Sequence, residues 1–174
     1  MANLEELIDE IDRFKAEGAD MYKGGNYDGA IVAWKEAAKM VLKAVCTGPE
    51  ALANSKLSML DHAINSNLAM AHYKMKDFST CVMFCDKSLL RRKTMPKDLL
   101  EKNLYRKASA EYELMNFEKC KIACEELIEN FPSNAAGIQL LRTVERDLLD
   151  EARTEKANYA KLFQKLKSEN RKPA

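Results

Sequence analysis

One pattern of small and aromatic residues occurs three times along the chain and constrains the fold more than any other feature. In each copy a small residue precedes an aromatic residue by four positions, and a second aromatic follows five positions later, directly after a polar residue. A second small residue comes three positions after that. The members are Gly18, Tyr22, Asn26, Tyr27 and Ala30; Ala69, Tyr73, Asp77, Phe78 and Cys81; and Ala108, Tyr112, Asn116, Phe117 and Cys120. Such repetition predicts similar units that stack on one another.

The packing of two helices explains why these residue types recur at this spacing. Small residues at a crossing point let two helices approach closely, and the aromatic rings fill the space beside the contact. The polar residue should begin the second helix by accepting a hydrogen bond from one of its free amides. The pattern predicts helices over 3–23, 27–46, 51–75, 78–92, 97–114, 117–130 and 134–168. Breaks are expected at Thr47-Gly48-Pro49 and at Lys93-Thr94-Met95-Pro96.

This pattern is typical of the tetratricopeptide-repeat (TPR) helix pair. The predicted fold class is therefore all-α, a TPR superhelix of three helix pairs plus a long C-terminal capping helix. We expect residues 1–133 to hold three units, at about 11–46, 51–92 and 97–132. Residues 134–174 should form the capping helix, which covers the last apolar face, and a frayed basic tail.

From about Phe14 to Phe163 the sequence resembles the TPR domains of immunophilins and other heat-shock co-chaperones, and the stretch 155–163 looks like the end of such a domain. The resemblance implies that the concave groove binds the acidic Glu-Glu-Val-Asp end of a cytosolic heat-shock protein of the ninety- or seventy-kilodalton class. Members of this group hold that end with five side chains, known as a carboxylate clamp. Four of the five match here in residue type, at Lys15, Asn67, Lys102 and Arg106.

The fifth clamp position departs from the group, because Ala19 stands where the others have asparagine. The matching residues suit the task, since an end with two carboxylates can be held by cations and amide donors that converge from several helices. Lys102 and Arg106 are four residues apart and so share one helix face. Losing one donor that faces a charged group costs about 1.5–3 kcal/mol. The groove would therefore bind the same ligand more weakly or serve a different acidic tail.

Composition and charge exclude several functions. The 28 basic and 27 acidic residues give a net charge of +1, without the basic excess that nucleic-acid binding usually needs. No apolar run reaches the ~18 residues of a membrane span. Neither histidine belongs to a recognisable catalytic or metal motif, and no cofactor is expected. We predict that the chain is not an enzyme, that it is cytoplasmic or also nuclear, and that its partners are a chaperone tail and a client or second adaptor protein.

Three alternatives stay open at this stage. The pairs Cys81/Cys85 and Cys120/Cys124 could form a metal site, but small apolar packing positions explain them better. The stretch 156–172 could be an amphipathic partner helix, for instance one that binds calmodulin, rather than a frayed end. The chain could also be a scaffold that binds a different partner, or the non-catalytic TPR part of a larger immunophilin, a peptidyl-prolyl isomerase.

Overall fold

A computed structural model describes residues 4–46 and 55–169. Its helices are α1 (Leu4–Lys23), α2 (Tyr27–Cys46), α3 (Ser55–Lys74), α4 (Phe78–Leu89), the short 3-10 turn η2 (Arg92–Thr94), α5 (Lys97–Glu113), α6 (Phe117–Asn130) and α7 (Ala135–Glu169). The described part of the chain contains no strand, which confirms the all-α prediction. The predicted break at Thr47-Gly48-Pro49 lies outside the described residues.

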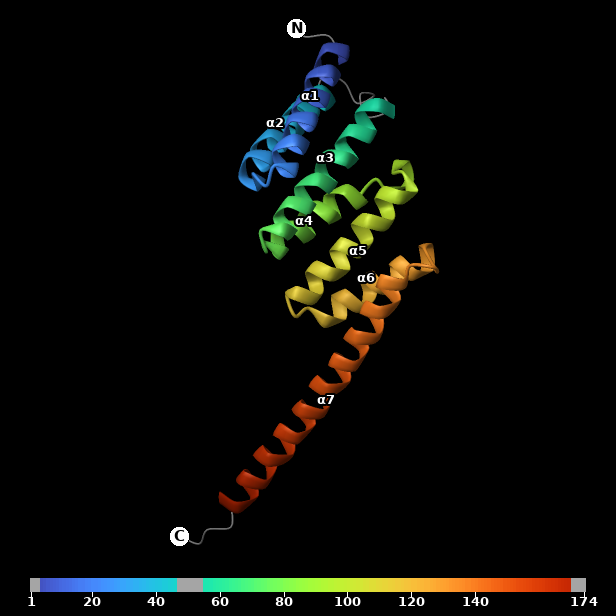
Figure 1. Ribbon diagram of the computed structural model, residues 1–174. Coiled ribbons are helices and arrows are strands. Elements are labelled where there is room, and N and C mark those ends of the chain that lie inside the picture. The colour runs from blue at the N-terminus through green and yellow to red at the C-terminus, as the bar shows by residue number, and fades with distance from the viewer. Residues whose placement is uncertain (1–3, 47–54, 170–174) are drawn as a thin grey trace.

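The helices form successive pairs that stack into a superhelix, as Figure 1 shows. Helix α1 packs on α2, α3 on α4 and α5 on α6. The first helices α1, α3 and α5 also contact one another in turn, and α7 adds a fourth member beside α5. This arrangement places α1, α3 and α5 in one inner layer, where the side chains of three separate units can face a common ligand.

The small residues of the repeated pattern lie where the paired helices meet. Ala69, Ala108, Cys81 and Cys120 are fully buried. Gly18 is the tightest case, because a Cβ atom there would lie 2.4 Å from the indole nitrogen of Trp34. Two apolar clusters result: one joins α1, α2, α3 and α4, with Ala110 added from α5. The other joins α5, α6 and α7.

The turn inside each pair has the same backbone geometry. Gly25, Lys76 and Met115 all have positive φ, at 81°, 59° and 60°. In each turn the amide of this residue donates to a carbonyl three residues back, and the next amide donates to a carbonyl five residues back. This is the Schellman motif that ends a helix with one left-handed residue. Only the first turn uses glycine, so the other two bear the steric cost of a side chain in this conformation.

The polar residue after the left-handed position was expected to cap the following helix, and this holds in two turns. The side-chain oxygen of Asn26 accepts from the amide of Gly29 at 2.9 Å, and that of Asp77 accepts from the amide of Thr80 at 3.2 Å. The prediction is wrong for Asn116. Its side-chain amide donates instead to Glu111 at 2.8 Å, because that carboxylate is buried and needs a donor.

We expect Met115→Gly to stabilise the protein by about 1 kcal/mol, since glycine adopts the left-handed conformation without the clash of a Cβ. The Met115 side chain is 67% exposed, so its removal forfeits little packing. Met115→Ala is the matched control, because it removes the same side chain and keeps the Cβ. The free energy of unfolding in urea would decide, and a glycine variant no more stable than the alanine variant would contradict the argument.

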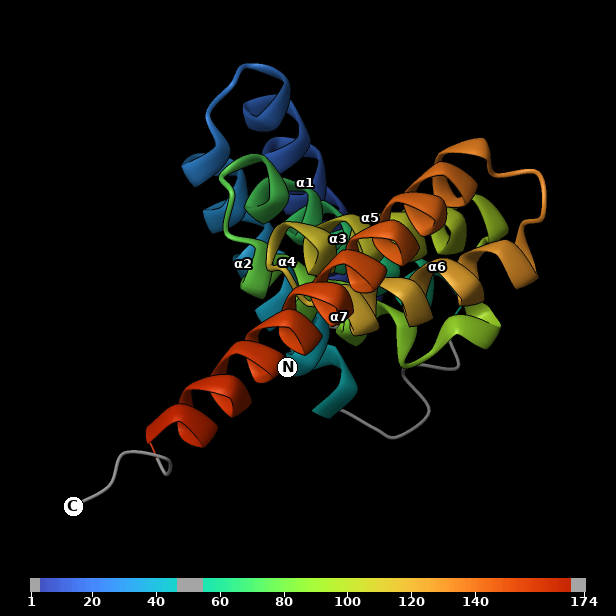
Figure 2. The same ribbon diagram turned by 90° about the horizontal axis from the view of Figure 1, so that it is seen from below.

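Helix α7 extends well beyond the third helix pair that it caps, as Figure 1 and Figure 2 show. Val144 is buried, and Leu140, Leu141 and Leu148 pack against the second apolar cluster. Every residue from 149 to 167 is exposed. The helix continues to Glu169, so Lys156, Lys161, Lys165 and Lys167 lie on regular helix. Their neighbours are mostly Ala, Leu, Lys and Gln, which favour helix.

Candidate functional site: cationic side chains on the first helices

The four matching clamp residues all lie on the inner-layer helices. Lys15 belongs to α1, Asn67 to α3, and Lys102 and Arg106 to α5. Contacts between α1 and α3, and between α3 and α5, hold these three helices side by side (Figure 1). The sequence pattern therefore assigned the candidate residues to three neighbouring helices of one layer.

Arg106 is the most firmly positioned of the four. One guanidinium nitrogen donates to the hydroxyl of Ser66 at 3.2 Å, to the Ser66 carbonyl at 3.4 Å and to the side-chain oxygen of Asn103 at 3.1 Å. Ser66 directly precedes Asn67, so these bonds bring the guanidinium against the turn of α3 that carries the second candidate. The fixed head leaves other N–H donors of Arg106 for a ligand, since a guanidinium has five.

The charge of Arg106 also reaches α1 across the inner layer. Burial raises the pKa of Tyr22 above its ordinary value, the nearby Tyr27 adds to the rise, and Arg106 opposes it. The hydrogen bond with Cys85 lowers the pKa of Cys81 in α4, burial opposes this, and Arg106 adds to the lowering. Arg106 on α5 therefore acts electrostatically on side chains of α1 and α4, and the same charge would attract an anionic ligand end.

Lys15 and Lys102 each have a carboxylate partner within their own helix. The ammonium of Lys15 lies 2.6 Å from Asp12, and that of Lys102 lies 3.6 Å from Asp98. The Lys102 side chain is 64% exposed and that of Lys15 is 31% exposed. Among the described residues no hydrogen bond joins either lysine to Arg106, so the three cations share a layer without a common contact. Exposed pairs of this kind are weak and can be exchanged for a ligand carboxylate.

Ala19 occupies the fifth position on α1. It is partly buried and packs against the first apolar cluster. Its methyl group offers no hydrogen bond, so the α1 side of the groove presents Lys15 as its candidate donor. Asn67 on α3 is half-buried.

No protein-family model matches the chain. Peptidyl-prolyl cis-trans isomerase FKBP4 of Rattus norvegicus is 26% identical over 171 residues, and the match covers 98% of this chain. The human protein of the same name matches equally well. The chain spans 36% of the length of these relatives.

Several solved structures have the same fold as this chain. The C-terminal TPR-containing domain of a Plasmodium falciparum FK506-binding protein superposes with a TM-score of 0.72 at 24% identity, over 88% of this chain and 97% of that one. The first TPR domain of human RPAP3 gives 0.63 at 19% identity, over 84% and 98%. The fold is that of a TPR domain.

Two further TPR domains of this fold were solved with acidic peptides. The first TPR domain of Spaghetti (RPAP3), bound to the HSP90 peptide SRMEEVD, has a TM-score of 0.60 at 21% identity, over 81% of this chain and 97% of that one. The second TPR domain of human RPAP3, in complex with the HSP70 peptide SGPTIEEVD, has 0.59 at 16% identity, over 82% and 98%. At these identities the likeness concerns the fold alone.

Within this TPR domain a buried polar chain supports Arg106, and sequence reasoning missed it. Asn103 is fully buried; its amide donates to the hydroxyl of Ser88 at 3.2 Å, and its oxygen accepts from Arg106. Ser88 in turn donates to the carbonyl of His62 at 3.4 Å. The available signal was the spacing, since Asn103 precedes Arg106 by three residues and so lies on the same face of α5.

The backbone of Lys15 is also held from the interior. The indole N–H of Trp34 donates to the carbonyl of Lys15 at 3.0 Å, and Trp34 itself is fully buried. The first apolar core thus fixes the turn of α1 from which Lys15 projects.

The four cysteines of the repeated units are buried in the two apolar clusters. The hydrogen bond between the thiols of Cys81 and Cys85, together with burial, raises the pKa of Cys85 well above its ordinary value. Among the residues that the structure describes, no group of three or more His, Cys, Asp or Glu side chains could hold a metal ion.

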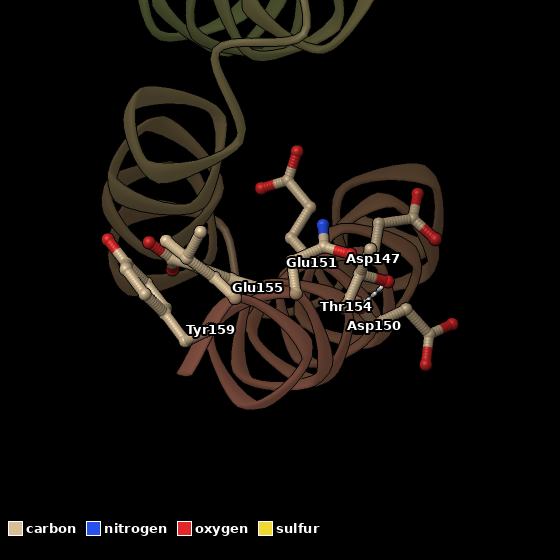
Figure 3. A pocket seen from close by; sticks show the side chains of 8 residues that line it. Asp147, Asp150, Glu151, Thr154, Glu155 and Tyr159 are labelled. Atoms are coloured by element: carbon tan, nitrogen blue, oxygen red, sulfur yellow. Dashed lines mark hydrogen bonds between the residues drawn. The ribbon is translucent and has the colours of Figure 1, made fainter. Parts of the chain in front are cut away.

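A pocket of about 730 Å³ lies away from the clamp candidates, along α7. Four carboxylates line it together with Tyr159 and Leu162. Figure 3 shows Asp150, Asp147, Glu151, Glu155 and Tyr159 following one another around the helix. Its acidic lining would repel an acidic peptide end, so the cationic inner layer remains the candidate peptide site. In the described ranges, no helix is both long enough and apolar enough to cross a membrane.

Proposed function

We propose that this TPR domain binds the acidic C-terminal Glu-Glu-Val-Asp end of a heat-shock chaperone of the ninety or seventy class and acts as a co-chaperone or adaptor. The observation that carries the proposal is the position of Arg106. Three hydrogen bonds hold its guanidinium against the turn of α3 that bears Asn67, and Lys102 lies one turn away on the same face of α5. Arginine held in this way can grip a carboxylate with two parallel bonds.

Structures of other proteins with this fold also support the proposal. Two domains that share this fold were solved with peptides that end in Glu-Glu-Val-Asp. The four matching side chains would give such an end three cations and one amide donor. The reaction named by the immunophilin relatives is not part of the proposal, because the described residues form only the TPR fold. With a chaperone partner of this kind, the chain would act in the cytoplasm, or also in the nucleus.

The direct test is calorimetric titration with the peptide SRMEEVD, with the same peptide amidated at its C-terminus as the control. We expect the free-acid peptide to bind and the amidated one to bind far more weakly, since amidation removes one of the two terminal carboxylates. No detectable heat at millimolar free-acid peptide would refute the proposal and leave the scaffold reading, in which the groove serves another partner.

We expect Ala19→Asn to tighten binding of the same peptide by about 10-fold or more, because a restored donor to a charged group contributes about 1.5–3 kcal/mol. The matched control is Ala157→Asn, which makes the same change on the exposed part of α7. Unchanged affinity in the Ala19 variant would mean that this position does not face the ligand.

A further inference from the structure

Two stretches of the chain have the charge pattern of a phosphorylation sequence, and the structure distinguishes between them. In each stretch, two consecutive basic residues lie three and two positions before a residue with a hydroxyl group. The stretches are Arg91-Arg92-Lys93-Thr94 and Arg106-Lys107-Ala108-Ser109. Protein kinases with acidic side chains beside the active site select such sequences by charge complementarity. By sequence alone, Thr94 and Ser109 are therefore equivalent candidates.

Ser109 lies within helix α5, where the fold protects it. A kinase binds the residues around the acceptor in an extended form, so these residues must first leave their helix. Helix α5 packs on α4, α6, α3 and α7. The side chain of Arg106, which the kinase would have to bind, donates to Ser66 and Asn103. Extending this stretch would unwind a central helix of the domain, so the second sequence is not available in the folded protein.

Thr94 lies in a much smaller element. It is the last residue of the 3-10 turn η2 between α4 and α5, and it is exposed. The amide of Thr94 donates to the Arg91 carbonyl and the amide of Met95 donates to the Arg92 carbonyl, both at 3.1 Å. A three-residue 3-10 turn is held by few hydrogen bonds. Opening it releases the buried Met95 but leaves both neighbouring helices intact, so an extended form is within reach.

We propose that Thr94 is a phosphorylation site for a basophilic protein kinase, meaning one that recognises arginine two and three positions before the acceptor. The hydroxyl oxygen of Thr94 attacks the γ-phosphorus of ATP. A new O–P bond forms while the bond to the leaving oxygen of ADP breaks, and the hydroxyl proton passes to a carboxylate of the kinase. The products are phosphothreonine and ADP. Arg91 and Arg92 would bind acidic side chains of the kinase.

The surroundings of the Thr94 hydroxyl suit the phosphate once it is attached. The hydroxyl oxygen lies 3.0 Å from Nε2 of His62 and 3.3 Å from the hydroxyl of Ser58. A pocket of about 350 Å³ opens beside it, lined by Ser58 and by the three basic residues that precede Thr94. A phosphate adds about 1.5–2 negative charges and three acceptor oxygens. Nearby hydroxyl, imidazole and cationic groups can donate to these oxygens.

Both arginines of the sequence already have a carboxylate partner. Arg91 pairs with Asp61 of α3, and Arg92 pairs with Glu126 of α6. The Arg92 side chain is 58% exposed and that of Glu126 is 30% exposed. Pairs that water reaches are weak, so the kinase can exchange Glu126 for its own carboxylate. The pair should therefore slow the reaction without preventing it.

The test is phosphorylation of the whole chain by the catalytic subunit of cAMP-dependent protein kinase, whose acceptor sequence is Arg-Arg-X-Ser/Thr, with magnesium and ATP. We expect one phosphate per chain, located at Thr94 by tandem mass spectrometry, and none in the variant Thr94→Val. Ser109→Ala is the matched control, which should leave the incorporation unchanged. No incorporation into the wild type, or incorporation at Ser109 in place of Thr94, would overturn the proposal.

Initial rates from the same assay test the recognition. Arg92→Gln should slow phosphorylation at least 10-fold, because it removes a cation that the kinase binds. Glu126→Gln should speed it by about 2- to 5-fold, because it frees Arg92 from an exposed pair. Circular dichroism would verify that both variants fold. Equal rates for the wild type and Arg92→Gln would contradict recognition of this sequence. Peptide titrations report separately on the groove.

Discussion

Replacing Arg106 with alanine is expected to abolish binding of the SRMEEVD peptide, with a loss of at least 100-fold in affinity. Truncating one partner of a desolvated charge pair typically costs about 2–5 kcal/mol. Arg106 combines a fixed position with spare donors, whereas Lys102 and Lys15 lie at the rim with exposed local partners. Calorimetric titration would give the ratio of dissociation constants.

Two companion variants separate charge from geometry. Arg106→Lys keeps the positive charge and removes the planar fork, so it should restore only part of the affinity. Arg92→Ala removes an exposed arginine that pairs with Glu126, and it should leave the affinity unchanged. Circular dichroism would verify that each variant folds. Peptide binding by Arg106→Ala within 3-fold of the wild type would show that the ligand does not use this side chain.

Replacing Trp34 with alanine should have the largest effect on stability, a loss of about 3–5 kcal/mol, because it leaves a cavity in the first apolar core. Trp34 is fully buried, and it donates the hydrogen bond that holds the Lys15 carbonyl. Urea unfolding followed by circular dichroism would measure the change. A loss below about 1 kcal/mol would mean that the core collapses around the missing ring.

Gly18 provides the complementary measurement. In the wild type a Cβ at this position would meet the Trp34 ring at 2.4–2.8 Å, so Gly18→Ala should destabilise the protein by overpacking. In the Trp34→Ala background the ring is absent, and the same change should stabilise by about 1 kcal/mol through the better helix propensity of alanine. The effect of Gly18→Ala should therefore change sign between the two backgrounds. The same sign in both would refute the steric explanation.

Much of this fold can be predicted from local sequence. The exceptions are helix ends that depend on contacts between residues far apart in the chain. Most predicted ends agree with the structure within one or two residues, because Schellman turns and caps are local features. Helix α4 was predicted to continue to Arg92 but ends at Leu89, before a 3-10 turn. Arg91 there pairs with Asp61 of α3 and Arg92 with Glu126 of α6. Such partners are distant in sequence, so no local pattern reveals them.

For the candidate site too, the sequence predicts some features and not others. The repeat spacing was enough to assign Lys15, Asn67, Lys102 and Arg106 to inner helices, because equivalent positions of stacked units face the same side. It did not reveal how Arg106 is anchored, since Ser66 and Ser88 belong to other helices. Asn116 is a similar case. Its residue type favours a helix cap, but its side chain donates to the buried Glu111 instead.

The division of the interior into two clusters has a mechanical consequence. The first two helix pairs are joined by interdigitated apolar side chains, whereas the junction to the third pair also relies on polar contacts such as Arg106–Ser66 and Asn103–Ser88. A junction with less close-packed hydrocarbon resists deformation less than a fully interdigitated one. Bending of the array should therefore concentrate at this junction. A chain end gripped between Lys15 and Arg106 would span it, so that occupancy stiffens the whole solenoid and sets its curvature.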